Sequence, residues 1–215
     1  MCDKIARVSP GELYVIGRVL NAKYIDYSYV AAIKDIGADF DLFENETTDR
    51  LVAMGLLEGD FSGRVVPKED TVSLFTPVFF GTVETTLDIC TIEEPTRIDT
   101  FKFHFFDDQI TKVTGIDGGI LQLENTEKDA LVKMIDSLLI RNLKTEDTPD
   151  EEEFSKEKVT RFVVAKSNHV SVNSMVATFM EVNGRMYKED AAGNVFCLKT
   201  DEFKEEIARI LMGVM

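Results

Sequence analysis

Few side chains in this 215-residue chain could carry catalysis or bind a metal, and they are widely spaced. The only histidines are His104 and His169, and neither has a cysteine or a second histidine at ligand spacing. A metal site or a general base needs such partners. We therefore expect His104, on the polar side of a strand, and His169, in the Ser167-Asn168-His169 turn region, to be surface or structural residues.

The cysteines give no stronger signal. Cys2, Cys90 and Cys197 are too far apart for a disulfide framework or a zinc site. Cys197 alternates in phase with Val195 along a strand pattern, which predicts an ordinary buried thiol.

Two acidic segments have simple structural interpretations. Asp107-Asp108 could bind a cation, but two acids between strands are typical of a turn. Asp117-Gly118-Gly119 resembles the middle of a calcium loop and lacks its alternating acids and terminal glutamate. The sequence also has no nucleophile elbow, P-loop or dinucleotide fingerprint. We predict a non-enzyme without cofactor or metal, and an enzyme with a site assembled from scattered residues is the alternative.

The overall charge narrows the class of partner. The formal net charge is −15, from 24 basic and 39 acidic residues. Such a chain repels phosphate backbones and anionic membrane surfaces. We find no charged-then-apolar leader and no apolar run of bilayer-spanning length. We expect a cytoplasmic protein that binds neither nucleic acid nor membrane.

Two stretches, Phe101–Leu139 and Val176–Gly213, repeat one order of elements. Each has a strand, a tight polar turn, a strand, a glycine-containing turn, a strand and an amphipathic helix that begins with acids. This duplication predicts an α+β fold, with a central antiparallel sheet built from two pseudo-twofold-related βββα repeats. An N-terminal helical, winged-helix-like segment precedes them.

The N-terminal segment begins with a well-marked helix. In Ser9-Pro10-Gly11-Glu12, serine is the cap, proline takes the first helical position and glutamate can reach back to the cap. Further helices are predicted over 27–36, from Thr47 or Thr48 to Gly55, and over 68–79. Strands are predicted over 82–93 and 98–107.

The segment from Leu51 to Val66 resembles the helix, Gly-Leu-Leu junction and wing hairpin of a winged helix. A helix that reads DNA needs lysines and arginines for phosphates and base edges. Only Lys34, Arg50 and Arg64 are basic between residues 24 and 66. A winged-helix-derived regulator without strong DNA binding therefore stays an alternative.

We predict a single α+β domain over residues 1–215. It divides into a helical N-terminal segment over 1–81, a first half over 82–144, an acidic linker over 145–153 and a second half over 154–215. The linker prediction follows from the density of like charges, which repel each other and resist packing.

One strand is apolar on both faces and needs cover on both. Val176, Met180 and Val182 lie on one face of the predicted strand Ser174–Val182, and Met175 and Phe179 lie on the other. The cover is either the protein's own helices or a partner helix or second subunit, so the chain is expected to be a monomer or a homodimer. Met175, Phe179 and Met180 are the candidate protein-binding residues.

Three short motifs together resemble the EspG-type chaperones of type VII (ESX) secretion and related proteins of Gram-positive bacteria. They are Ser-Pro-Gly-Glu-Leu at 9–13, Leu-Val-Ala-Met-Gly-Leu-Leu at 51–57 and Val-Asn-Gly-Arg at 182–185. The resemblance implies a cytosolic α+β protein without cofactor, which binds a helical tip of a secreted cargo dimer. It therefore implies a secretion-associated chaperone or adaptor.

Overall fold

The computed structural model describes residues 5–31, 33, 39–116, 119–141, 143–144, 154–169, 172–190 and 192–212. Contacts group the chain into two compact units. Unit 1 comprises Met1–Thr82 and His104–Thr126, and unit 2 comprises Val83–Phe103 and Glu127–Met215. The predicted linker 145–153, Asp117, Gly118 and Cys2 lie outside the described residues.

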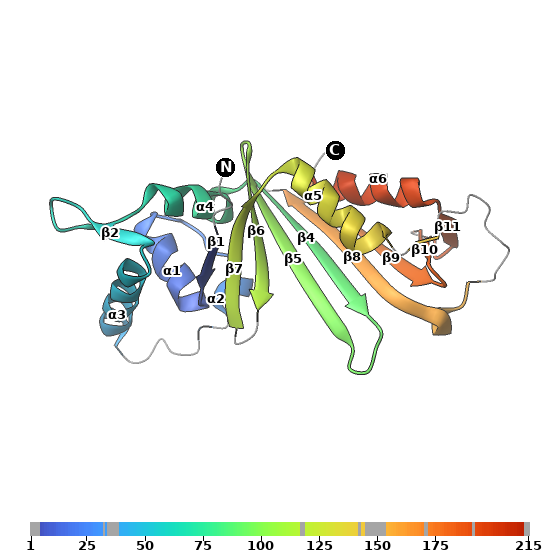
Figure 1. The fold of residues 1–215 in the computed structure, drawn as a ribbon, viewed down its shortest axis with the longest axis horizontal. Helices are drawn as coiled ribbons and strands as arrows, with labels where there is room; N and C mark the ends of the chain where they lie inside the picture. The colour runs from blue at the N-terminus through green and yellow to red at the C-terminus, as the bar shows by residue number, and fades with distance from the viewer. Residues whose placement is uncertain are drawn as a thin grey trace. The chain divides into compact units, whose positions relative to one another are not determined.

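Within the described residues, the main sheet has nine strands in the order β1-β7-β6-β5-β4-β8-β9-β10-β11 (Figure 1). The pairs β1–β7, β6–β7, β4–β8, β8–β9, β9–β10 and β10–β11 are antiparallel. The bounds are β1 Ile5–Val8, β4 Val83–Thr91, β5 Arg97–Phe106, β6 Gln109–Ile116, β7 Ile120–Thr126, β8 Val159–His169, β9 Val172–Val182, β10 Arg185–Glu189 and β11 Val195–Leu198. The predicted α+β class with a central antiparallel sheet is confirmed.

The strand order is symmetric about the β4–β8 pair, because β4-β5-β6-β7 on one side is matched by β8-β9-β10-β11 on the other. The helices α5 (Lys128–Ile135) and α6 (Thr200–Leu211) follow the two sets. Both predicted βββα repeats are present, and each extends by one strand at its N-terminal end. The added strand of the second repeat, β8, includes Ser167, Asn168 and His169, so the turn predicted there is wrong.

The contact units group the elements differently from the predicted halves. Strands β6 and β7 belong to unit 1, whereas α5, which follows them in the first repeat, belongs to unit 2. The predicted division into 1–81, 82–144 and 154–215 cuts the chain into consecutive segments. The contact units instead group elements that pack together, so each unit contains two separate segments of the chain. A single domain over 1–215 stays a prediction.

Unit 1 contains the helical segment. Its elements are α1 Pro10–Val19, α2 Tyr27–Val30, α3 Phe40–Ala53, the hairpin strands β2 Leu57–Gly59 and β3 Val65–Pro67, and α4 Glu69–Phe80. The predicted capping box of α1 is present, since Ser9 Oγ accepts from the Glu12 amide at 3.2 Å and Glu12 Oε2 accepts from the Ser9 amide at 2.7 Å. The unit's core includes Val8, Leu13, Ile16, Leu51 and Phe75.

Two helix predictions in unit 1 need correction or remain partly untested. Helix α3 begins at Phe40, because the Asp39 carboxylate caps it by accepting from the Leu42 amide at 3.0 Å. Thr47, a predicted cap, is a buried residue inside α3. Helix α2 ends at Val30, and residues 34–36 of the predicted second helix lie outside the described part.

In unit 2, α6 packs on the sheet through a buried apolar face made of Phe203, Ile207, Ile210 and Leu211, as its periodicity predicts. The π-helical turn Asp136–Ile140 continues α5, and a 3-10 turn spans Lys156–Lys158. Figure 1 shows α5 and α6 along the same side of unit 2. Among the described residues, no helix has the length and apolar character needed to cross a membrane.

Candidate functional site

The two faces of the unit 2 sheet differ in what covers them. Successive residues of a strand point to opposite faces. The Thr85 hydroxyl of β4 donates to the Leu211 carbonyl of α6 at 3.0 Å. The Arg161 guanidinium of β8 donates to the carbonyls of Leu138 and Leu139 at 2.9 and 3.2 Å. Odd-numbered residues of β4 and β8 therefore face the helices.

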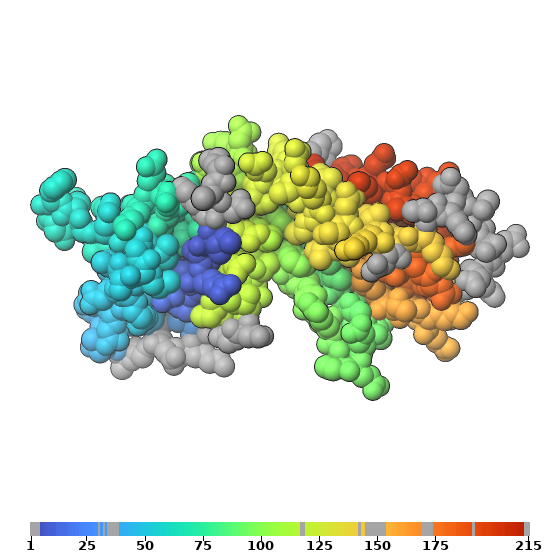
Figure 2. Space-filling view, in the orientation of Figure 1, coloured from blue at the N-terminus to red at the C-terminus, as the bar shows by residue number. Residues whose placement is uncertain are grey.

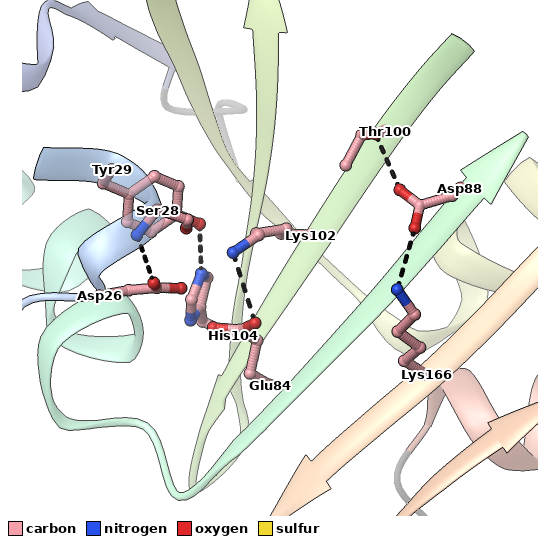
Figure 3. Close-up of polar contacts among 9 residues, drawn as sticks. All are labelled: Asp26, Ser28, Tyr29, Glu84, Asp88, Thr100, Lys102, His104 and Lys166. Carbon is pink, nitrogen blue, oxygen red and sulfur yellow. Dashed lines mark hydrogen bonds and ion pairs between the residues drawn. The ribbon is translucent and has the colours of Figure 1, made fainter. Parts of the chain in front are cut away.

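The even-numbered residues lie on the opposite face, where side chains from three strands meet (Figure 3). The Thr100 hydroxyl of β5 donates to Asp88 Oδ1 at 2.8 Å, and Lys166 Nζ of β8 lies 3.6 Å from Asp88 Oδ2. Lys102 of β5 pairs with Glu84 of β4 at 3.5 Å. Asp88 thus links β5, β4 and β8 through its two oxygens.

We call this surface the open face. Cross-strand register extends it to β9, because Val176 lies opposite Lys166 and Thr178 lies opposite Val164. Its members, by strand alternation and register, are Glu84, Thr86, Asp88, Cys90, Ile98, Thr100, Lys102, Phe162, Val164, Lys166, Val176, Thr178 and Met180. Of these, Thr86 and Met180 are buried.

The open face is electrically balanced within a strongly acidic chain. Glu84 is paired with Lys102 and Asp88 with Lys166, so its charged side chains sum to zero, whereas the whole chain carries −15. Partly exposed ion pairs of this kind add little to stability. They hold the side chains in place, and a neutral patch on an acidic protein can approach an uncharged or acidic surface without repulsion.

Large apolar side chains lie exposed on the same face. Ile98 of β5 is 67% exposed and Val176 of β9 is 61% exposed. Ile92, just after β4, is also exposed. Exposed aliphatic side chains beside fixed hydrogen-bonding groups form the type of surface found at protein interfaces. Sequence periodicity counted Val176 among the apolar residues of its strand and did not show that it is uncovered.

The predicted binding residues lie mostly in the core. Phe179 is fully buried and packs edge-on against Phe203 of α6, with ring centroids 5.0 Å apart. Met180 is buried in a small cluster with Val159, Val182 and Tyr187. Met175 is half-buried. This placement favours the interpretation that the protein's own residues cover Phe179 and Met180. A role of Met175, Phe179 and Met180 in partner binding stays a prediction.

His104 is structural. Its side chain is buried in unit 1, and Nε2 lies 2.7 Å from the Tyr29 hydroxyl of α2 (Figure 3). The polar side of β5 at this position is therefore inside the unit, not at the surface. His169 lies in β8, with its Cα opposite that of Val83.

The remaining candidates for chemistry have structural roles. Asp107-Asp108 forms the predicted turn between β5 and β6, with Asp107 at φ +49°. Cys197 is half-buried, less than predicted, and burial raises the pKa of its thiol. Across the described ranges, no group of three or more His, Cys, Asp and Glu side chains is arranged to hold a metal ion.

The winged-helix-like segment has the predicted geometry. Helix α3 ends at Ala53 with Met54 as its C-cap, Gly55 follows at φ +74°, and the β2–β3 hairpin takes the place of the wing. Arg50, the arginine of α3, interacts with other residues of unit 1. Its guanidinium lies 3.5 Å from the Glu12 carboxylate and donates to the Thr47 hydroxyl at 2.9 Å.

No model of a known protein family matches the sequence, and a search of curated proteins finds no match. The fold matches a solved structure of the Mycobacterium tuberculosis type VII secretion system chaperone EspG5, determined in complex with the PE25-PPE41 dimer. The match covers 99% of this chain and 97% of that one, with a TM-score of 0.61 and 7% sequence identity. The chain is therefore similar in fold to an EspG chaperone over almost its whole length.

Proposed function

We propose that this chain is a non-enzymatic protein-binding protein, a secretion-associated chaperone or adaptor that holds a helical segment of a secreted protein on its open face. The observation that carries the proposal is the charge-balanced open face with Ile98 and Val176 exposed. The fold of a chaperone solved with its PE25-PPE41 dimer supports it.

The width of the open face and its paired side chains suit one helix. Four adjacent strands at about 4.8 Å spacing give a surface about 14 Å wide, and a helix with its side chains is about 10–12 Å wide. An amphipathic helix can cover Ile98 or Val176 with apolar residues and place polar residues over the Asp88 and Glu84 pairs. Because the Thr100 hydrogen bond and the two ion pairs already hold these side chains, little side-chain entropy is lost on binding.

Electrostatics argues against DNA binding by the winged-helix-like segment. Between Asp39 and Val66, seven acidic residues accompany two basic ones, Arg50 and Arg64. Phosphate contacts require the opposite balance. The proposed partner is therefore a protein, and we place the binding event in the cytoplasm, before export, with the chain as a monomer or homodimer.

The test is affinity purification from the native host with the full-length chain and matched variants. Val176→Asp and Ile98→Asp put a charge on the open face, and Val72→Asp makes the same change at an exposed position of α4. We expect a secreted helical protein to co-purify with the wild type and Val72→Asp. Its recovery should fall about tenfold or more with either open-face variant.

Thermal unfolding of each variant confirms that it is folded before it is compared. The proposal fails if no secreted helical protein co-purifies with the wild type. It also fails if both open-face variants retain that protein as well as Val72→Asp does.

A further inference from the structure

The tip of the β2–β3 hairpin is a five-residue loop, Asp60–Arg64, closed by its own hydrogen bonds. Asp60 Oδ1 accepts from the Ser62 amide at 2.8 Å, the Ser62 hydroxyl at 2.7 Å and the Arg64 amide at 2.8 Å. The Asp60 amide donates to the Arg64 carbonyl at 2.7 Å, and Gly63, at φ +79°, donates to the Asp60 carbonyl at 3.0 Å. These bonds close the loop on itself and fix its backbone.

Phe61 follows the capping aspartate and is fully exposed. The hairpin that carries it projects from the surface of unit 1, as its teal atoms show in Figure 2. A single exposed apolar residue is common on protein surfaces, so exposure alone decides nothing. The feature that needs an explanation is that a loop closed by several hydrogen bonds holds a phenylalanine in solvent.

A second loop of the same chain shows that the loop itself does not require phenylalanine. Asp190 Oδ1 accepts from the Ala192 and Asn194 amides at 2.8 and 2.9 Å. The Asp190 amide donates to the Asn194 carbonyl at 2.9 Å, and Gly193 donates to the Asp190 carbonyl at 3.0 Å. This is the bonding pattern of the Asp60 loop, and the sequence has alanine at position 191, where the other loop has Phe61. The aromatic ring therefore serves something other than the turn.

We infer that Phe61 is an anchor side chain that inserts into an apolar pocket with a basic rim on a protein partner. An aromatic ring on a fixed backbone supplies a large contact area and loses little entropy on binding. We infer the basic rim of the partner's pocket from the negative charge around Phe61. Helix α3 and the hairpin carry a net charge of −5 over residues 39–66, which attracts lysines and arginines and repels anionic lipid.

This contact is independent of the proposed chaperone function. Phe61 belongs to unit 1, and the open face belongs to unit 2. The variants that test one surface change no residue of the other, so the two proposals can fail separately.

The experiment begins with a photo-reactive phenylalanine, benzoylphenylalanine, at position 61 of the full-length chain in its native host. The same residue at position 191 is the matched control on the equivalent loop. We expect position 61 to cross-link a specific protein that position 191 does not, and mass spectrometry identifies it.

The identified protein is then purified and titrated against the chain. The chain has no tryptophan, so Phe61→Trp creates a single fluorophore at the hairpin tip and Ala191→Trp creates one at the control loop. We expect a blue shift of emission for Phe61→Trp only, and binding to Phe61→Ala weaker by about tenfold or more. Raising the ionic strength should slow association, as a basic rim requires.

Phe61→Ala is expected to keep the wild-type thermal midpoint, because the side chain is fully exposed. The inference is overturned if positions 61 and 191 cross-link the same proteins, or if the identified protein binds Phe61→Ala as tightly as the wild type. It is also overturned if the blue shift of Phe61→Trp occurs instead with phosphatidylcholine–phosphatidylglycerol vesicles, or on concentrating the chain alone.

Discussion

The hydroxyl of Tyr29 and Nε2 of His104 lie 2.7 Å apart with both side chains buried, and this contact joins α2 to β5 inside unit 1. Their rings also approach, with centroids 5.8 Å apart. Buried polar groups are costly unless they are hydrogen-bonded. The contact therefore holds the short helix α2 in position.

Tyr29→Phe removes this hydrogen bond and keeps the ring. We expect the free energy of unfolding to fall by about 1–3 kcal/mol, because a buried histidine loses a partner. Tyr27→Phe in the same helix is the control: Tyr27 is 79% exposed, and its change should stay within about 0.5 kcal/mol. Urea unfolding measures both, and equal effects would contradict a structural role for the buried pair.

Gly81 lies where no side chain fits. A Cβ there would be 2.3 Å from the Pro77 carbonyl oxygen and 2.8 Å from the Phe105 carbonyl oxygen. These are backbone atoms, so Gly81→Ala must shift the end of α4 or β5, and we expect a loss of about 1–3 kcal/mol or more. Gly115→Ala, which meets nothing within 4 Å, should have little effect. Thermal unfolding of the two variants checks this, and similar midpoints would show that the predicted clash is absent.

Phe179 and Val176 separate core from surface on one strand. Phe179→Ala opens a cavity against Phe203 and should cost about 3–5 kcal/mol of unfolding free energy. Val176→Ala removes an exposed side chain and should cost little. Chemical denaturation gives both values. A small loss for Phe179→Ala would revive the interpretation of Phe179 as an interface residue.

The pKa values of Asp60 and Asp190, the aspartates that close the two loops, should lie below the ordinary range of an aspartate. Hydrogen bonds, chiefly from the Ser62 side chain, lower the pKa of Asp60 from its usual 3.8, and bonds chiefly from the Asn194 side chain lower the pKa of Asp190. A lowered pKa in the folded state stabilises the fold above pH 3.8. That contribution is lost as pH falls through the folded value.

Carboxyl NMR titration tests this prediction with an internal control. In Ser62→Ala, the midpoint of Asp60 should rise toward 3.8, while that of Asp190 stays where it is. A midpoint of Asp60 that does not move would mean that the hydroxyl bond to Ser62 is not formed in solution.

Local signals predicted most of the helices and the repeats. The capping box at Ser9 and Glu12, the apolar stripe of α6 and the Asn183-Gly184 turn each depend on residues a few positions apart, so they can be identified without the fold. The start of α3 was missed because Thr47 has the side chain of a cap, and the actual cap at Asp39 precedes a stretch with little amphipathic pattern.

The sequence alone determined the α+β class, the repeated order of strands and helix, and the absence of a recognisable catalytic motif. Tertiary structure alone decided that His104 is buried, that β8 pairs with β4, and that Val176 and Ile98 are exposed while Phe179 and Met180 are not. The physical reason is that a strand's side-chain period shows which residues share a face. Whether that face is buried depends on helices that are distant in the sequence. Helix α6, for example, contacts β4 although the two are far apart in the chain.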